Sequence, residues 1–197
     1  MTDTKILQPA ELAKNHWLKP YYFSRAAFSV IWVAAAFTVG KSIPAVAGAL
    51  LLAYPTWDAA ANLLDARANG GLQKNPTQAL NTVVSVVTAI AVAIALGMNM
   101  NAVLGVFGVW AGLAGLFQLT TGVRRWKSYG AQWAMILSGA QSALAGLVFI
   151  KQASGPNVPS IVDIAPYAAF GAFYFLVSAI WLQVSDVRRR KTAFVTT

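Results

Sequence analysis

The sequence predicts an all-α, polytopic membrane protein with six transmembrane helices arranged as three consecutive helical hairpins. Of its 197 residues, 57% are hydrophobic and only 11% are charged, whereas about 25% of the residues in a soluble domain are charged. Charged residues are also absent from three long stretches, residues 75–123, 128–150 and 164–185. A helix needs about 20 residues to cross a hydrocarbon core of ~30 Å. The first stretch therefore has room for two spans and each of the others for one.

The first predicted hairpin consists of spans over residues 21–40 and 43–65, joined by a short turn that contains Gly40 and Pro44. Residues 1–20 precede it as a cytoplasmic segment. Within that segment, the spacing of Leu12, Ala13 and Trp17 is compatible with a short interfacial helix.

The second predicted hairpin covers residues 78–97 and 101–123, and the third covers residues 130–150 and 164–185. These spans are predicted to be helices rather than barrel strands, because a barrel strand alternates lipid-facing and lumen-facing residues. The stretch Val83–Leu96 instead is apolar on every face apart from small hydroxyls. Together the spans form a transmembrane domain over residues 21–185.

The basic residues fall on one side of this series of spans, with only Lys41 and Lys151 on the other side. Cytoplasmic loops carry the excess of Lys and Arg in membrane proteins. Both termini are therefore predicted to be cytoplasmic, including a basic tail over residues 186–197. The residues on the cytoplasmic side are Lys5, Lys14, Lys19, Arg25, Arg67, Lys74, Arg124, Arg125, Lys127, Arg188, Arg189, Arg190 and Lys191.

The net charge of +9 is explained by this topology and by attraction to anionic lipid headgroups, which contributes about 1 kcal/mol per basic residue near the surface. Nucleic acid is not expected as a partner, because no recognition fold remains outside the spans. The chain has no cysteine and a single histidine, His16. It also lacks a phosphate-binding loop and a metal-ligand spacing. We therefore expect no enzymatic activity, no cofactor and no metal.

Glycines at steps of three and four residues form a seam on the fourth span, and a shorter seam lies on the fifth. Such seams let two helix backbones approach closely in lipid. Packing within one molecule is the favoured interpretation, and a homo-oligomer formed through the same seam is the alternative. The glycines are Gly105, Gly108, Gly112 and Gly115 on the fourth span, and Gly139 and Gly146 on the fifth.

A polar face on the second span is the candidate site. Asp58, Asn62 and Asp65 are spaced i, i+4 and i+7, which places them on one side of a helix. Arg25, in the same half of the first span, is the expected partner of Asp65 or Asp58. A charged group at that depth is costly unless it is paired, hydrated or neutral.

The third span repeats the i, i+4, i+7 spacing with Asn81, Ser85 and Thr88. The two polar stripes could enclose a hydrated cavity that opens to the cytoplasm, or they could form a closed hydrogen-bond network. A structural clamp is the favoured interpretation. The alternatives are a small transporter or proton-coupled channel, and a site for a ligand or lipid headgroup.

The fourth and fifth spans resemble a known family. Gly105, Gly108, Trp110, Gly112 and Gly115, followed by Arg124-Arg125 and by residues 133–146, are similar to the repeat of the HdeD-like bacterial membrane proteins. The resemblance covers mainly residues 101–191. It implies a three-hairpin protein of the bacterial inner membrane with a structural or stress-related role, such as acid resistance, and it brings no catalytic residues.

Overall fold

The computed structural model describes residues 9–124 and 132–195, and within these ranges every regular element is helical. The predicted all-α class is therefore confirmed for this part of the chain. A short π-helix, Ala36–Gly40, extends the first helix, and a 3₁₀ turn, Leu72–Lys74, lies between the second and third. The α-helices are α1 (Pro9–Ala35), α2 (Pro44–Ala68), α3 (Pro76–Leu96), α4 (Met100–Arg124), α5 (Gln132–Ala153) and α6 (Ile161–Val195).

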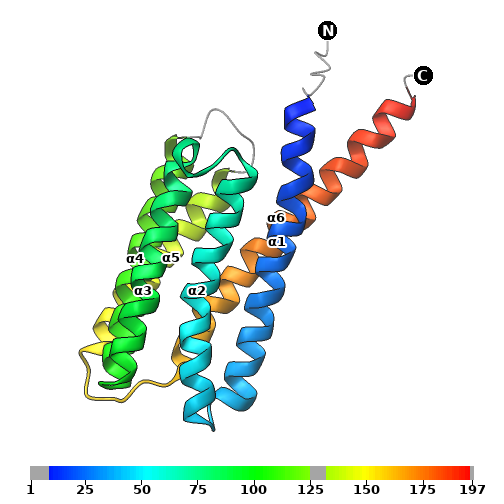
Figure 1. The fold of residues 1–197 in the computed structure, drawn as a ribbon. Coiled ribbons are helices and arrows are strands. Elements are labelled where there is room, and N and C mark those ends of the chain that lie inside the picture. Colours follow the sequence, from blue (N-terminus) through cyan, green and yellow to red (C-terminus); the bar gives the residue numbers. More distant parts are fainter. Residues whose placement is uncertain (1–8, 125–131, 196–197) are drawn as a thin grey trace.

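The helices run alternately up and down, so the two ends of the chain lie at the same end of the bundle (Figure 1). Pro44 and Pro76 stand at the starts of α2 and α3, where proline loses no hydrogen bond and has a suitable φ angle. Helix α1 has no break between residues 20 and 21. Residues 9–20 are thus continuous with the rest of α1, and their placement at the membrane interface stays a prediction.

The helices that follow each other as predicted hairpins are not the pairs with the most extensive contacts. Those contacts join α1 to α6, α2 to α3, and α4 to α5. The alternating direction of the helices agrees with three consecutive hairpins, and the structure adds which helices pack most closely. Hydropathy places a span in the chain but does not determine which side of it meets a neighbour, because that depends on side-chain shape along the whole helix.

Four helical segments are long and apolar enough to cross a membrane: Trp17–Gly40, Pro76–Leu96, Met100–Thr120 and Ile161–Ser185. These four support membrane embedding, whereas six spans stay a prediction. Helix α2 falls short in the residues described because Pro55, Asp58 and Asp65 interrupt its apolar sequence.

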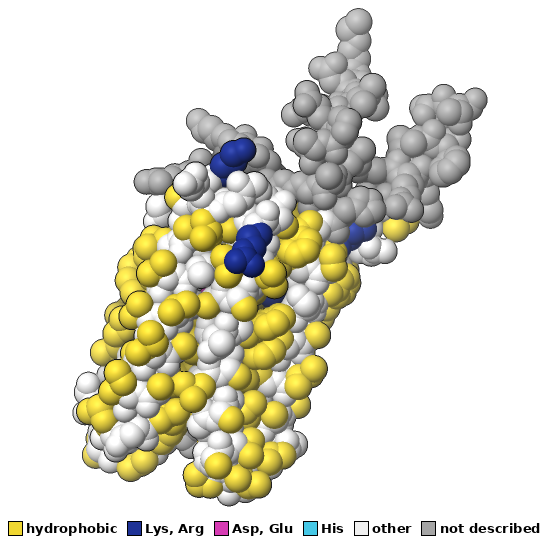
Figure 2. Space-filling model, viewed as in Figure 1, with side chains coloured by type: hydrophobic (Ala, Val, Ile, Leu, Met, Phe, Trp, Pro, Cys, Tyr) yellow, Lys and Arg dark blue, Asp and Glu magenta, His cyan; other side chains and the backbone are white. Residues whose placement is uncertain are grey.

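The outer surface of the bundle is apolar. Ile31 on α1, Ile94 on α3 and Leu147 on α5 are 65–68% exposed, which would be unfavourable in water and is favourable in lipid. Figure 2 shows hydrophobic side chains over the length of the visible face, with Lys and Arg only toward its upper end.

The apolar core lies between α1, α2, α4 and α6. Trp32, Leu51, Phe107 and Ile164 are at most 1% exposed and belong to one cluster. Tyr54 is a member of the same cluster and lies one helical turn before Asp58 in α2. The polar site therefore begins where the apolar core of α2 ends.

Candidate functional site

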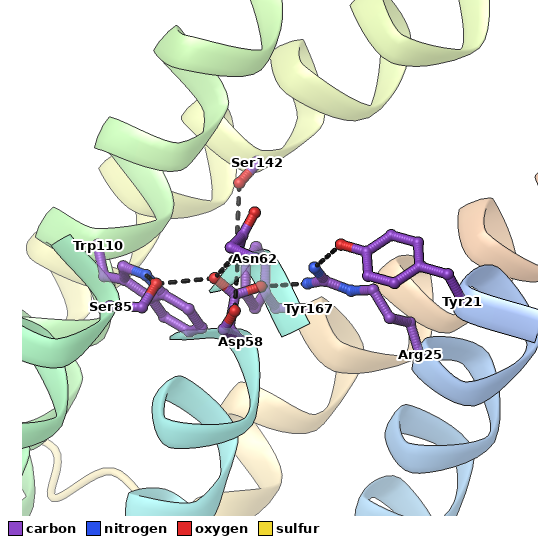
Figure 3. Close-up of polar contacts among 8 residues, drawn as sticks. All are labelled: Tyr21, Arg25, Asp58, Asn62, Ser85, Trp110, Ser142 and Tyr167. Atoms are coloured by element: carbon purple, nitrogen blue, oxygen red, sulfur yellow. Dashed lines mark hydrogen bonds and ion pairs between the residues drawn. The ribbon is translucent and has the colours of Figure 1, made fainter. Parts of the chain in front are cut away.

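The Asp58 carboxylate is the centre of a hydrogen-bonded network (Figure 3). Its Oδ1 atom forms an ion pair with the Arg25 guanidinium. Its Oδ2 atom accepts hydrogen bonds from Ser85 Oγ at 2.7 Å and from Asn62 Nδ2 at 3.0 Å. The Arg25 and Asp58 side chains are 12% and 18% exposed. Both carboxylate oxygens are thus occupied by donors in a largely buried setting.

The donors to the Asp58 carboxylate are placed by the helices on which they lie. Asn62 lies one turn after Asp58 on α2, and its amide also donates to the Asp58 backbone carbonyl at 2.8 Å. Ser85 lies on α3, where it is 1% exposed, and it accepts a hydrogen bond from Trp110 Nε1 of α4 at 3.2 Å. Trp110 therefore extends the network from α2 and α3 to the fourth helix.

Arg25 connects the network to α1 and α6. Its second terminal nitrogen donates to the hydroxyl of Tyr21, one turn earlier, at 3.0 Å. Its guanidinium carbon lies 4.3 Å from the centre of the Phe175 ring on α6, a cation–π geometry that arginine favours. Five of the six helices contribute a side chain to this single group of contacts.

Asp65 has a separate set of partners nearer the chain termini. It is 6% exposed and accepts hydrogen bonds from Trp17 Nε1 at 3.2 Å, Asn69 Nδ2 at 2.9 Å and Gln78 Nε2 at 3.1 Å. These three donors are neutral and come from the beginning of α1, the end of α2 and the beginning of α3. Asp65 thus joins the ends of three helices.

The structure brings together four of the seven residues that the sequence suggested for the site. Arg25, Asp58, Asn62 and Ser85 form the network, whereas Asp65 has its own partners. The Thr88 hydroxyl donates to the Val84 carbonyl of its own helix at 2.8 Å. Within the described ranges, Asn81 is not joined to either carboxylate.

Sequence reasoning missed several members of these networks. The contact of Tyr21 with Arg25 could have been predicted from their i, i+4 spacing, which places both on one face of the helix. Trp17 was considered only as part of an interfacial helix, and Trp110 only as part of the family resemblance. The contacts of Trp17 with Asp65 and of Trp110 with Ser85 join residues 48 and 25 positions apart, and no local pattern predicts such pairs.

The chemical groups in the two networks determine what these networks can bind or hold. No group of three His, Asp or Glu side chains that could hold a metal occurs in residues 9–124 and 132–195. Two buried donors, Arg25 Nε and Trp57 Nε1, have no hydrogen-bond partner among these residues. The arrangement can hold helices together by charge-assisted hydrogen bonds, which are about twice as strong as neutral ones.

The glycine seam lies between α4 and α5. A Cβ atom added to Gly146 would be 2.6 Å from the carbonyl oxygen of Gly108, and one added to Gly139 would be 2.9 Å from that of Gly115. The two backbones therefore touch at these four glycines. Gly105 and Gly112 have more room, since a Cβ on Gly105 would make an ordinary contact with Ala153 and one on Gly112 would meet nothing within 4 Å. Helix α5 of the same molecule occupies this face.

Part of the chain matches a known sequence family. Residues 80–151 match the sequence family described as a short repeat of unknown function, DUF308, which is typical of HdeD-like membrane proteins. No curated protein and no solved structure matches the chain.

The match extends from Leu80 in α3 to Lys151 in α5. It begins before the region of resemblance predicted from the sequence, 101–191, and leaves residues 152–191 outside. Ser85, Trp110 and the glycine contacts lie inside the matched part, whereas Arg25 and Asp58 lie outside it. The chain is thus a helical membrane protein in which residues 80–151 are similar to the DUF308 repeat.

Proposed function

We propose that this chain is a non-enzymatic, HdeD-like protein of the bacterial inner membrane, with six spans and a structural or stress-related role such as acid resistance. The observation that carries the proposal is the occupation of both Asp58 carboxylate oxygens by Arg25, Ser85 and Asn62. A carboxylate that carries an ion or proton through a protein must offer it a free oxygen. Asp58 instead is held by donors from three helices, which is the arrangement of a clamp.

The position of the clamp agrees with this role. It ties α1 and α2 to Ser85 and Trp110, which lie in the part similar to the DUF308 repeat. The cost of leaving one buried charge without its partner is about 3–5 kcal/mol. Selection for a stable assembly of helices is therefore sufficient to explain a charged pair at this depth.

A flux measurement tests the proposal against the transport alternative. The purified protein and the Asp58→Asn variant, reconstituted into liposomes with a pH gradient, are expected to dissipate the gradient no faster than protein-free liposomes. An ionophore added at the end confirms that the gradient was intact. Flux through the unmodified protein that is lost in a folded Asp58→Asn variant would establish transport and contradict the clamp.

Basic side chains support the proposed orientation. Lys41, in the turn after α1, and Lys151, in the last turn of α5, are exposed at one end of the bundle. Arg67 and Lys74 are exposed at the other end, where α2 leads into α3. The end with the chain termini is the more basic one in the sequence as a whole, and we assign it to the cytoplasm.

Cysteine labelling tests this orientation directly, because the natural chain contains no cysteine. Single cysteines at Ser42 and Ser154 are expected to react with a membrane-impermeant maleimide added to the periplasmic side of intact cells. Both positions are exposed. A cysteine in place of exposed Lys74 serves as the control and should react only after the membrane is opened. Labelling of Lys74→Cys in intact cells, or protection of either serine position, would refute the six-span orientation.

A further inference from the structure

The six helices divide into two groups, the pair α1 and α6 and the group α2 to α5. The contacts between these groups differ between the two ends of the bundle. Helices α1 and α6 pack closely along each other, whereas α1 makes few contacts with α2 and α6 makes few with α5. Figure 1 shows the second part of α6 together with α1 on one side of the bundle, whereas the first part of α6 lies behind α2. The direct contacts of α1 with α2 and of α6 with α5, across the boundary between the two groups, are thus less extensive than those within the pairs α1–α6, α2–α3 and α4–α5.

The α1–α6 pair is held together by contacts of its own. The Tyr22 and Phe175 rings stack with their centres 6.2 Å apart. Lys19 Nζ donates to Gln183 Oε1 at 3.3 Å, and Arg25 lies over the Phe175 ring. These contacts lie in the half of the bundle near the chain termini. They allow α1 and α6 to move as one body there.

At the opposite end, near Gly40, the pair and the group are joined by tight apolar packing. A Cβ atom added to Gly40 would lie 3.2 Å from a side-chain atom of Leu50 on α2, across the boundary, and 3.4 Å from one of Ile161 on α6, within the pair. Trp32 is 1% exposed, and its indole nitrogen donates to the Leu50 carbonyl at 2.6 Å. The apolar side chains packed here exclude solvent, and separating them would expose them.

In the half of the bundle nearer the chain termini, most of the described contacts across this boundary are polar. Phe28 still stacks on Trp57, with ring centres 4.9 Å apart. Beyond this point α1 presents Arg25 to Asp58 and, two turns nearer the terminus, Trp17 to Asp65. Water that enters from the membrane surface can replace each partner in such polar contacts, whereas the apolar packing near Gly40 offers it no polar group to bind.

The backbone changes its geometry at the closely packed end. Residues Ala36–Gly40 form a π-helix that contacts both α2 and α6. Such single π-turns within α-helices are uncommon and often accompany functional sites. The pair of helices thus meets the group of four through an irregular turn at one end and through replaceable polar contacts at the other.

We propose that α1 and α6 swing together about the Gly40 end, and that the Arg25–Asp58 ion pair and the Trp17–Asp65 hydrogen bond form a latch that closes the other end. Release of the latch opens the boundary next to Asp58, Asn62 and Asp65, with the end near Gly40 still packed. The hinge itself depends only on the packing, whereas the statement that it opens toward the cytoplasm rests on the proposed orientation.

Distance measurements between spin labels test the hinge. One pair of labels, at Leu80 on α3 and Val184 on α6, spans the boundary at the latch end. A second pair, at Val39 and Met98, spans it at the Gly40 end. All four side chains are exposed, and the natural chain has no cysteine to compete for the label. The protein is measured in lipid nanodiscs by double electron–electron resonance.

The latch variant combines Trp17→Phe with Asp58→Asn. It is expected to lengthen and broaden the Leu80–Val184 distance distribution and to leave the Val39–Met98 distribution as it is in the unmodified protein. The control variant is Thr88→Val, since Thr88 is buried but donates only within its own helix; it should leave both distributions unchanged.

Two results would overturn the hinge. An unchanged Leu80–Val184 distribution would show that the polar contacts do not hold the boundary closed, and equal broadening of both pairs would show general loss of packing. Trp17→Phe alone removes the indole donor and keeps a smaller aromatic side chain, so it repeats the test if the double variant does not fold. Flux in liposomes would contradict the proposed clamp function without affecting these distances, so the two failures are distinguishable.

Discussion

Replacing Asp58 with asparagine is expected to lower the free energy of unfolding in detergent by about 3–5 kcal/mol, the range found when one partner of a buried ion pair is removed. The carboxylate is paired with the charged Arg25 guanidinium and accepts hydrogen bonds from the neutral Ser85 and Asn62 side chains. An asparagine keeps the shape of the side chain but leaves the Arg25 charge without its counter-ion. The fraction unfolded is measured by circular dichroism during titration with sodium dodecyl sulfate.

A double-mutant cycle separates the ion pair from other effects. Arg25→Met with Asp58→Leu removes both charges and is expected to recover most of the stability lost in either single variant, because no unpaired charge remains. Thr88→Val is the matched control for removing a buried polar group outside the network. If the double variant is as unstable as the sum of the single variants, the two residues do not act as a pair and the clamp is wrong.

Replacing Gly115 with alanine is expected to lower the free energy of unfolding by about 1–3 kcal/mol, the usual cost of overpacking a tight interface. The new Cβ atom would lie 2.6 Å from the Gly139 carbonyl oxygen and closer still to the Ala143 backbone nitrogen. Backbone atoms of a packed helix cannot move aside as a flexible side chain can. Helices α4 and α5 must therefore separate, and the contacts on both sides of the seam weaken.

Gly112→Ala is the matched control on the same helix, because its Cβ atom would meet nothing within 4 Å. It is expected to change the free energy of unfolding by no more than about 0.5 kcal/mol, as substitutions without a packing effect usually do. Size-exclusion chromatography of both variants then reports on self-association. Equal stability of the Gly112 and Gly115 variants would show that the close approach of α4 and α5 does not limit stability.

The part of the candidate site that lies on a single helix could be predicted from the sequence. The i, i+4, i+7 spacing places Asp58, Asn62 and Asp65 on one face, because helical periodicity is a local property of the backbone. It does not say which carboxylate meets Arg25. That choice depends on the angle and depth at which α1 crosses α2, and in the structure Arg25 meets Asp58 while Trp17 meets Asp65.

Hydropathy and turn residues act over a few neighbouring positions, so the sequence predicted a helical membrane protein and the approximate ends of its middle helices. It did not predict that α1 begins at Pro9 and that α6 continues to Val195. It also identified the glycines as a packing surface. Only the tertiary structure decided that this surface of α4 meets α5, that α1 packs on α6, and that Trp110 and Phe175 belong to the same network as Asp58. These contacts join distant residues, and they depend on how the faces of whole helices fit together in three dimensions.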